Sequence, residues 1–159
     1  MKIAFDLDGT LVPAPGSPMP VERLGLFSQA ISRERIRAGT PGLLSGVRRR
    51  GHEVWLYTTS LRSPARLRMW FASFGVRLEG IVNQVRHQTA LADLDIDCSK
   101  YPPAFGIDLL VDDAEGVELE GERLGFSVLR IKEDDDAWCS RVYLAVIEFE
   151  SRACITDHR

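Results

Sequence analysis

The feature that most constrains this chain is a regular alternation of short apolar runs with longer segments of helical spacing. The runs with the length and composition of β-strands cover residues 2–5, 53–57, 80–83, 107–111 and 127–131. The segments with helical signals cover residues 21–31, 40–50, 63–74, 114–124 and 136–151. Such alternation favours a parallel sheet with helices packed on its faces. We therefore predict an α/β chain with a three-layer, Rossmann-like fold and a mainly parallel central sheet.

Three of the expected helices carry start signals. Thr40 and Ser63 each precede a proline, which is the order of an N-cap followed by the first helical residue. Asp136 is the expected cap of the last helix. These signals place three helix starts directly after loops.

Length and composition favour a single domain over residues 1–159, because 159 residues with 45% hydrophobic content suffice for one core. The stretch 12–20 contains four prolines and Gly16, so it is expected to be a loop. We predict that residues 11–39 form a flap with one short helix.

Charge and apolar patterning restrict the partners and the compartment. A net charge of −3 and a pI near 5.6 exclude a whole-molecule basic field for nucleic acid. No apolar stretch approaches the roughly 18 residues of a transmembrane helix, and Asp6 interrupts the first apolar run too early for a signal peptide. The three cysteines lack metal-ligand spacing and are interpreted as reduced thiols (Cys98, Cys139 and Cys154). We expect a cytoplasmic protein with no membrane partner.

Polar side chains follow the expected strands. The carboxyl ends of parallel strands meet at one edge of a sheet, where ligands bind. The residues that reach this edge are Asp6 and Asp8 after the first strand, Thr58, Thr59 and Ser60 after the second, Asn83, Arg86 and His87 after the third, and Asp112 and Asp113 after the fourth. This placement predicts a functional crevice at that edge.

Four carboxylates gathered at one edge repel one another. Each pair at about 4 Å costs roughly 4 kcal/mol at the effective dielectric of a protein surface, so the cluster requires a cation or raised pKa values. Oxygen ligands without His or Cys favour Mg²⁺. Taken singly, these aspartates also fit loop positions: Asp8-Gly9 is a turn dipeptide, and Asp113 could cap the next helix. Their joint placement favours a magnesium site made by Asp6, Asp8, Asp112 and Asp113.

The motif Phe5-Asp6-Leu7-Asp8-Gly9-Thr10-Leu11 resembles the first signature of the haloacid dehalogenase-like (HAD) hydrolase superfamily. Thr58 after an apolar strand resembles the second signature. Lys100 resembles the third, and Asp112-Asp113 after Leu109-Leu110-Val111 resembles the fourth. The resemblance spans residues 3–113, and its first signature is the most specific.

The resemblance implies a phosphatase mechanism with a role for each matched residue. Asp6 would attack phosphorus and form an aspartyl phosphate, and Asp8 would act as general acid and base. The Asp6 carboxylate, the Asp8 backbone carbonyl and Asp112 would hold Mg²⁺, with Asp113 as a ligand or an outer partner. Thr58 and Lys100 would bind phosphate oxygens.

Several assignments keep alternatives. The chain has 20 basic residues but only three lysines, which favours Lys100 over a plain solvated lysine, although Arg62, Arg66 or Arg86 could supply the charge instead. The apolar run ends at Tyr57, which favours Thr58, while Thr59 could add a hydroxyl or amide. Possible substrate contacts are Arg62, Arg86 and His87, because loops over the crevice bind ligands.

Neither residues 11–52 nor residues 61–99 are long enough for a folded cap domain, so the chain resembles the capless members of the superfamily. An open crevice suits a bulky phosphorylated substrate: a protein, a glycan, or a polynucleotide end as the one role for nucleic acid. Alternatively, a neighbouring subunit of a homo-oligomer could cover a small metabolite.

The alternative to an enzyme is a non-catalytic scaffold that binds a phosphorylated ligand or partner. Retention of both Asp6 and Asp8 argues against it.

Overall fold

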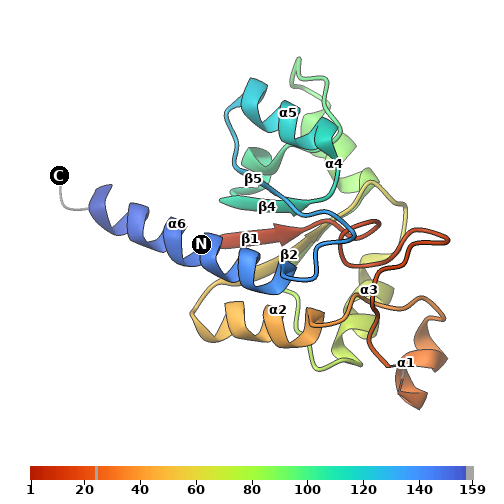
Figure 1. Ribbon diagram of the computed structural model, residues 1–159. Coiled ribbons are helices and arrows are strands. Elements are labelled where there is room, and N and C mark those ends of the chain that lie inside the picture. Colours follow the sequence, from red (N-terminus) through yellow and green to blue (C-terminus); the bar gives the residue numbers. More distant parts are fainter. Residues whose placement is uncertain (24, 157–159) are drawn as a thin grey trace.

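Five parallel strands form the central sheet of the computed structural model, which describes residues 1–23 and 25–156 (Figure 1). The strands are β1 (Lys2–Phe5), β2 (Glu53–Tyr57), β3 (Gly80–Val82), β4 (Leu109–Asp112) and β5 (Val128–Arg130). Their order across the sheet is β3-β2-β1-β4-β5, and every neighbouring pair is parallel. The prediction of an α/β fold with a parallel central sheet is confirmed.

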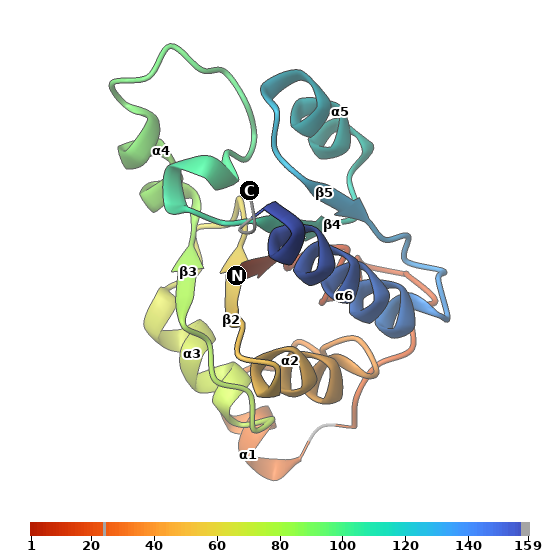
Figure 2. The same cartoon turned by 90° about the vertical axis from the view of Figure 1, so that its left-hand side faces the viewer.

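Helices cover both faces of this sheet and complete the three layers. The helices are α1 (Leu26–Ile31), α2 (Thr40–Arg49), α3 (Pro64–Ala72), α4 (Gln84–Leu91), α5 (Glu115–Leu124) and α6 (Trp138–Thr156), with a short 3-10 helix η1 (Pro102–Phe105). Figures 1 and 2 show α2, α3 and α6 on one side of the sheet and α4 and α5 on the other. Helix α1 packs against α3, outside the sheet.

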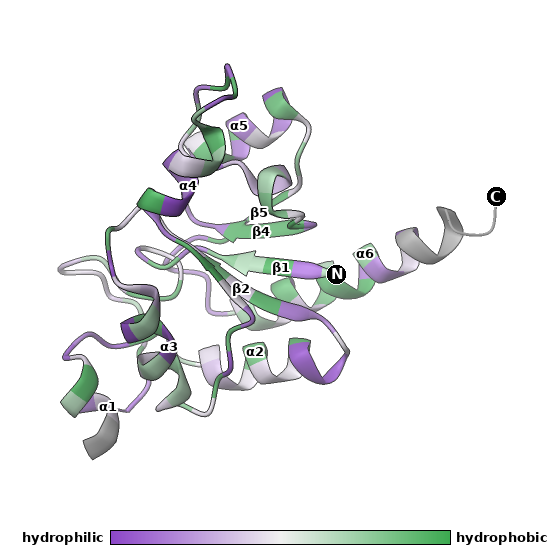
Figure 3. Ribbon diagram, turned by 180° about the vertical axis from the view of Figure 1, so that it is seen from behind, coloured by the Kyte–Doolittle hydropathy of each residue, from purple (hydrophilic) through white to green (hydrophobic). Residues whose placement is uncertain are grey.

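The central strand β1 is buried on both faces. Ile3 and Phe5 enter the core beneath α2, α3 and α6, whereas Ala4 enters the smaller core on the α5 side. In Figure 3, β4 and the part of β1 beyond its purple start carry the hydrophobic colour, as expected for inner parallel strands. The apolar run of β1 ends at Phe5, so Asp6 is the first polar side chain at the carboxyl edge.

Two predicted helix starts are wrong. The helix expected over 21–31 is reduced to α1, because Val21 instead forms an antiparallel bridge with Arg37. Thr40 is the first residue of α2 rather than its cap. Gly39 occupies the cap position with φ 87°, a left-handed conformation that favours glycine.

The last helix also differs from its prediction. The carboxylate of Asp135, rather than Asp136, accepts the amide of Ala137 at 3.0 Å just before α6. The helix then runs to Thr156, beyond the predicted end at Ser151. The apolar residues Trp138, Val142 and Val146 form the buried face of α6, which packs on the core beside the sheet.

Helices α4 and η1 were not predicted. The Asn83 side chain caps α4 by accepting the amide of Arg86 at 3.1 Å, a strong start signal at a strand end. Only His87 and Leu91 are buried among the residues of α4, so the apolar pattern was too sparse to indicate a helix. A proline pair begins η1.

A buried arginine fastens the 11–39 segment to the rest of the protein. Arg37 is 1% exposed, and its guanidinium lies 4.7 Å from the ring centroid of Trp138. It donates to the backbone carbonyls of Lys132, Glu133 and Asp135 at 2.9–3.1 Å. This bonding joins the segment before α2 to the loop before α6.

Among residues 1–23 and 25–156, no helix combines the length and the apolar character needed to cross a membrane. Cys98 and Cys139 are free thiols. The side chain of Cys154 lies outside the described residues.

Candidate functional site

The carboxyl edge of the sheet gathers polar side chains from four strands. Asp6 follows β1, Thr58 follows β2, and Asn83 follows β3, while Asp112 is the last residue of β4. The backbone register brings the first and fourth strands side by side, and the Asp6 amide donates to the Val111 carbonyl at 2.8 Å. Asp6 and Asp112 therefore lie on adjacent strands at the same edge.

A lysine bridges the two carboxylates of that edge. The Lys100 ammonium forms an ion pair with Asp6 and donates to Asp112 Oδ2 at 2.5 Å. Asp6, Lys100 and Asp112 are 5%, 3% and 1% exposed, so the three charges are nearly removed from solvent. Buried charges persist only when paired and hydrogen-bonded, and Asp112 Oδ1 also accepts the Ala114 amide at 2.9 Å.

Asp113 completes a cluster of three carboxylates. Oxygens of Asp6, Asp112 and Asp113 all lie within 4.8 Å of one another. Thr10 Oγ1 donates to Asp113 Oδ1 at 2.8 Å, which joins the loop after β1 to the end of β4. Gly9 makes this contact feasible: it has φ 91°, and a Cβ there would lie 2.7 Å from Asp113 Cγ.

The cluster carries more negative than positive charge. Burial raises the pKa of Asp6 to about 7; the Lys100 charge opposes this shift, and the Asp112 carboxylate adds to it. Burial also raises the pKa of Asp113, against the Thr10 hydrogen bond. Burial disfavours the Lys100 ammonium, but the two carboxylates outweigh it and hold the pKa of Lys100 above its ordinary value. When all three carboxylates are ionised, the single ammonium leaves an excess of negative charge, and this all-oxygen donor set fits a divalent cation such as Mg²⁺.

Asp8 lies apart from the cluster, at the protein surface. Its carboxylate is exposed and forms a two-point ion pair with Arg62, at 2.6 and 2.8 Å. Arg62 also donates to Glu34 at 2.7 Å. Asp8, Arg62 and Glu34 border a hollow of about 550 Å³ that Asp113 and the proline-rich residues 12–15 also line. The 11–39 segment thus forms one wall beside Asp8.

The residues after β2 differ in exposure. Thr58 is buried, and its Oγ1 donates to Ser60 Oγ and accepts the Ser60 amide, both at 3.1 Å. Thr59 is exposed and lines a separate hollow with Ser99 and Cys98. Thr58 is therefore buried at the carboxyl edge of the sheet, whereas Thr59 is exposed and lines that separate hollow.

Arg86 and His87 lie on α4, where each has protein partners. Arg86 donates to the Ile81 carbonyl at 2.8 Å and stacks on the Trp55 ring. His87 is buried, and its Nδ1 lies 2.6 Å from the Tyr57 hydroxyl. Burial lowers the pKa of His87, which favours the neutral ring at pH 7. In this structure both side chains support the fold around β2 and β3.

No protein-family model and no curated protein matches the chain. A chain of the solved Pnkp1/Rnl/Hen1 complex is 17% identical with a TM-score of 0.50, and the match covers 82% of this chain and 45% of that chain. A chain of the Pnkp1/Rnl/Hen1 RNA repair complex is 16% identical with a TM-score of 0.51, covering 82% and 42%. A predicted HAD-like family hydrolase from Porphyromonas gingivalis is 12% identical with a TM-score of 0.49, covering 91% and 97%.

The chain has a three-layer, Rossmann-like fold. At these identities the likeness to solved structures concerns the fold alone. The chain spans less than half the length of the first two neighbours.

Some residues of the site were missed by the sequence analysis. Thr10 and Glu34 contact Asp113 and Arg62 respectively, and neither was singled out. Tyr57 was interpreted only as the end of an apolar strand, yet its hydroxyl accepts the Tyr101 amide at 2.8 Å beside Lys100. Thr10 belongs to the first signature, which was a signal for it; nothing local in the sequence indicated the other two.

Proposed function

We propose that this chain is a magnesium-dependent phosphomonoester hydrolase of the HAD superfamily that works through an aspartyl phosphate at Asp6. The observation that carries the proposal is the buried Asp6–Lys100–Asp112 arrangement, with Asp8 two residues beyond Asp6. A nucleophilic carboxylate, a neighbouring fixed ammonium and an accessible second carboxylate are the groups that phosphoryl transfer through an enzyme carboxylate requires.

In the first half-reaction, a carboxylate oxygen of Asp6 attacks phosphorus, and the bond from phosphorus to the ester oxygen breaks. The departing alkoxide takes a proton from the Asp8 carboxyl group. Lys100 and Thr58 bind the phosphate oxygens and balance their charge. When bound at Asp6, Asp112, Asp113 and the Asp8 carbonyl, Mg²⁺ would supply the charge that lets an anionic phosphate approach a carboxylate.

In the second half-reaction, water attacks phosphorus and gives its proton to the Asp8 carboxylate. The bond between Asp6 and phosphorus breaks, which releases inorganic phosphate and restores the Asp6 carboxylate. Arg62 suits this step because its two-point ion pair orients the Asp8 carboxylate at the mouth of the site. Asp8 returns to the protonated form that the next cycle needs.

We propose a single domain over residues 1–159 without a separate cap, because the 11–39 segment holds only the short helix α1 among its described residues. The resulting crevice would accept a bulky phosphorylated substrate, or a smaller one covered by a second subunit of a homo-oligomer. Action in the cytoplasm is proposed from composition and the free thiols.

The direct test is hydrolysis of p-nitrophenyl phosphate with Mg²⁺. We expect activity to disappear in EDTA, to return with Mg²⁺, and to fall by about three orders of magnitude or more in Asp6→Asn. Asp134→Asn, in the exposed acidic loop before α6, is the matched control and should keep normal activity. Turnover that is undiminished in EDTA or in Asp6→Asn contradicts the mechanism. If no phosphate ester is hydrolysed, the scaffold alternative replaces the enzyme.

Asp8→Asn tests the role of the general acid. The variant keeps the backbone carbonyl but loses the proton donor. Hydrolysis of an alkyl phosphate, whose leaving group needs protonation, should slow by about 10²–10⁴-fold, whereas hydrolysis of p-nitrophenyl phosphate should slow far less. Rates should be compared for both substrates at saturating Mg²⁺. Equal losses on the two substrates would remove Asp8 from the acid role.

A further inference from the structure

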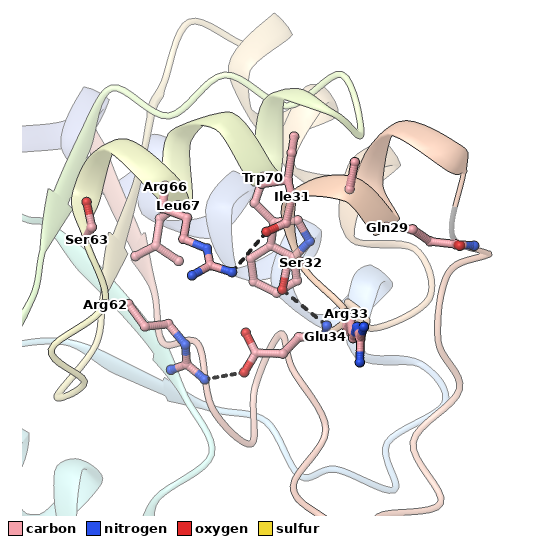
Figure 4. Close-up of a pocket in the computed structure, with 11 residues that line it drawn as sticks. Gln29, Ile31, Ser32, Arg33, Glu34, Arg62, Ser63, Arg66, Leu67 and Trp70 are labelled. Carbon is pink, nitrogen blue, oxygen red and sulfur yellow. Dashed lines mark hydrogen bonds and ion pairs between the residues drawn. The ribbon is translucent and has the colours of Figure 1, made fainter.

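A second, larger pocket opens beside the site, between α1 and α3. It has a volume of about 690 Å³, and Figure 4 shows its lining residues. The 3-residue segment Ser32–Glu34 after α1 forms one side, and Arg62, Arg66 and Trp70 form the other. Trp70 and Leu67 are buried and form an apolar floor. None of the residues predicted as catalytic lines it.

The walls of this pocket carry an excess of positive charge. Arg33, Arg62 and Arg66 line it, with Glu34 as the one acidic lining residue. Arg66 uses one nitrogen to donate to the Ile31 carbonyl at 3.1 Å (Figure 4), which leaves other guanidinium N–H groups free for a ligand. Arg33 is exposed and forms no ion pair with any described residue. Arg33 and Arg66 can therefore bind an anion without breaking an ion pair with a protein carboxylate.

The α1–α3 pocket adjoins the hollow at Asp8. Arg62 and Glu34 line both, and their ion pair of 2.7 Å forms the wall that the two spaces share. Arg62 also donates to the Asp8 carboxylate on the other side of this wall. A substrate with its reacting phosphate near Asp6 and Asp8 would pass over the Arg62–Glu34 pair and reach Arg66 and Arg33.

We propose that the α1–α3 pocket binds a second anionic phosphate group of the substrate, so that the preferred substrates are phosphomonoesters with a further phosphate or phosphodiester. This inference rests on the proposed function of the Asp6 site. Guanidinium groups match phosphate oxygens in a two-point geometry, and the apolar floor of Leu67 and Trp70 accepts the organic part between the two groups. A substrate with one phosphate would leave the pocket's positive charge unused.

The test uses one nucleoside in three forms: thymidine 5′-monophosphate, thymidine 3′,5′-bisphosphate and the dinucleotide pTpT. Phosphate release with Mg²⁺ gives kcat/KM for each. We expect kcat/KM for the bisphosphate, the dinucleotide or both to exceed that for the monophosphate by about tenfold or more, as a charge-assisted hydrogen bond provides. The bisphosphate and the dinucleotide distinguish a terminal phosphate from a phosphodiester as the bound group.

Variants locate the effect. Arg66→Gln and Arg33→Gln should each bring the kcat/KM ratio between the doubly charged substrate and the monophosphate close to one. Arg68→Gln is the matched control: Arg68 is exposed on the same helix but outside the pocket, so the ratio should stay at its wild-type value. Thermal unfolding of each variant identifies any general loss of structure. Because Arg33 makes no ion pair, Arg33→Gln remains informative if Arg66→Gln unfolds.

Failure of this inference differs from failure of the proposed function. The assignment of the α1–α3 pocket as a second anion site is wrong in either of two cases, provided that p-nitrophenyl phosphate is hydrolysed. In the first, the kcat/KM ratio between the doubly charged substrates and the monophosphate is near one in the wild type. In the second, Arg68→Gln lowers this ratio as much as Arg66→Gln does. If nothing is hydrolysed, calorimetric titration of the wild type with the same three compounds still tests whether the α1–α3 pocket binds a second anionic group. Tighter binding of the doubly charged compounds that Arg66→Gln abolishes supports the pocket, and equal binding overturns it.

Discussion

At the scale of single residues, Lys100 has the most unusual environment in the site. Its ammonium contacts Asp6 and Asp112, which are also two of the three carboxylates suited to a divalent cation. Lys100 and the proposed Mg²⁺ would therefore share the carboxylates of Asp6 and Asp112. Removing the ammonium should weaken phosphate binding while strengthening cation binding, since like charges near one another repel.

Lys100→Met tests this double role. We expect kcat/KM for p-nitrophenyl phosphate to fall by about 10²-fold or more, while calorimetry reports a lower dissociation constant for Mg²⁺ than in the wild type. Lys132→Met, at an exposed position before α6, should change neither quantity. Near-normal kinetics in Lys100→Met would transfer the phosphate-binding role to an arginine, with Arg62 as the next candidate. Weaker Mg²⁺ binding would contradict the electrostatic argument.

At the scale of elements, α4 and the end of β2 hold the loop that carries Lys100. The Tyr101 amide donates to the Tyr57 hydroxyl at 2.8 Å, so the hydroxyl proton is left to donate to His87 Nδ1. The Tyr57–His87 pair is buried between β2 and α4, and the Tyr101 amide that it holds follows Lys100 directly in the chain. This pair therefore positions Lys100 by holding the backbone of its loop, and not by contacting the substrate.

Tyr57→Phe removes this hydroxyl and leaves the Tyr101 amide unpaired. Loss of a partner for a buried polar group costs about 1–3 kcal/mol. We expect Tm to fall by roughly 2–10 °C and kcat/KM to fall about tenfold, with amide exchange accelerating in residues 98–102. Tyr143→Phe, on the exposed side of α6, is the control for loss of a tyrosine hydroxyl. Unchanged exchange around Lys100 would show that the pair does not position this loop.

At the scale of the whole molecule, we expect the site to make stability depend on pH and, through the proposed cation binding, on Mg²⁺. The pKa of Asp6 is about 7 in the folded, metal-free protein, against 3.8 for an ordinary aspartate. The folded state then binds more protons than the unfolded state between these values. The contribution of Asp6 to the free energy of unfolding therefore falls as pH rises from about 4 to about 7. Cation binding requires the carboxylate form, so the proposed Mg²⁺ would reverse this loss.

We therefore expect the rise in Tm caused by Mg²⁺ to be small at pH 5.5 and to reach its full size near pH 8. At 100 times its dissociation constant, a ligand stabilises by ~2.7 kcal/mol, or roughly 5–10 °C for a chain of this size. Thermal melts with and without Mg²⁺ across this range provide the measurement. Asp6→Asn should lose most of the pH dependence of the rise, whereas Asp134→Asn should keep it. A rise that is independent of pH in the wild type would exclude Asp6 as a ligand.

The fold and the carboxylate edge were predictable because their causes are local. A buried strand has the sequence pattern of a short apolar run, and the first polar residue after it marks where the strand leaves the core. Asp6 and Asp112 are such residues, and parallel pairing of β1 with β4 then brings them together. Helix α4 escaped prediction because only two of its residues are buried, so packing rather than pattern stabilises it.

By itself, the sequence determined which segments form the parallel sheet and which acidic residues end its strands, because apolar periodicity and turn chemistry act over a few residues. Only the tertiary structure decided which basic side chain pairs with each of these carboxylates. Lys100 reaches Asp6 across 94 residues of chain, and Arg62 reaches Asp8 across 54. The sequence offered several basic candidates at similar positions. Which of them reaches the carboxylates depends on long-range packing, such as the hydrogen bond from the Tyr101 amide to Tyr57 beside Lys100. No local pattern encodes the distance between two such side chains.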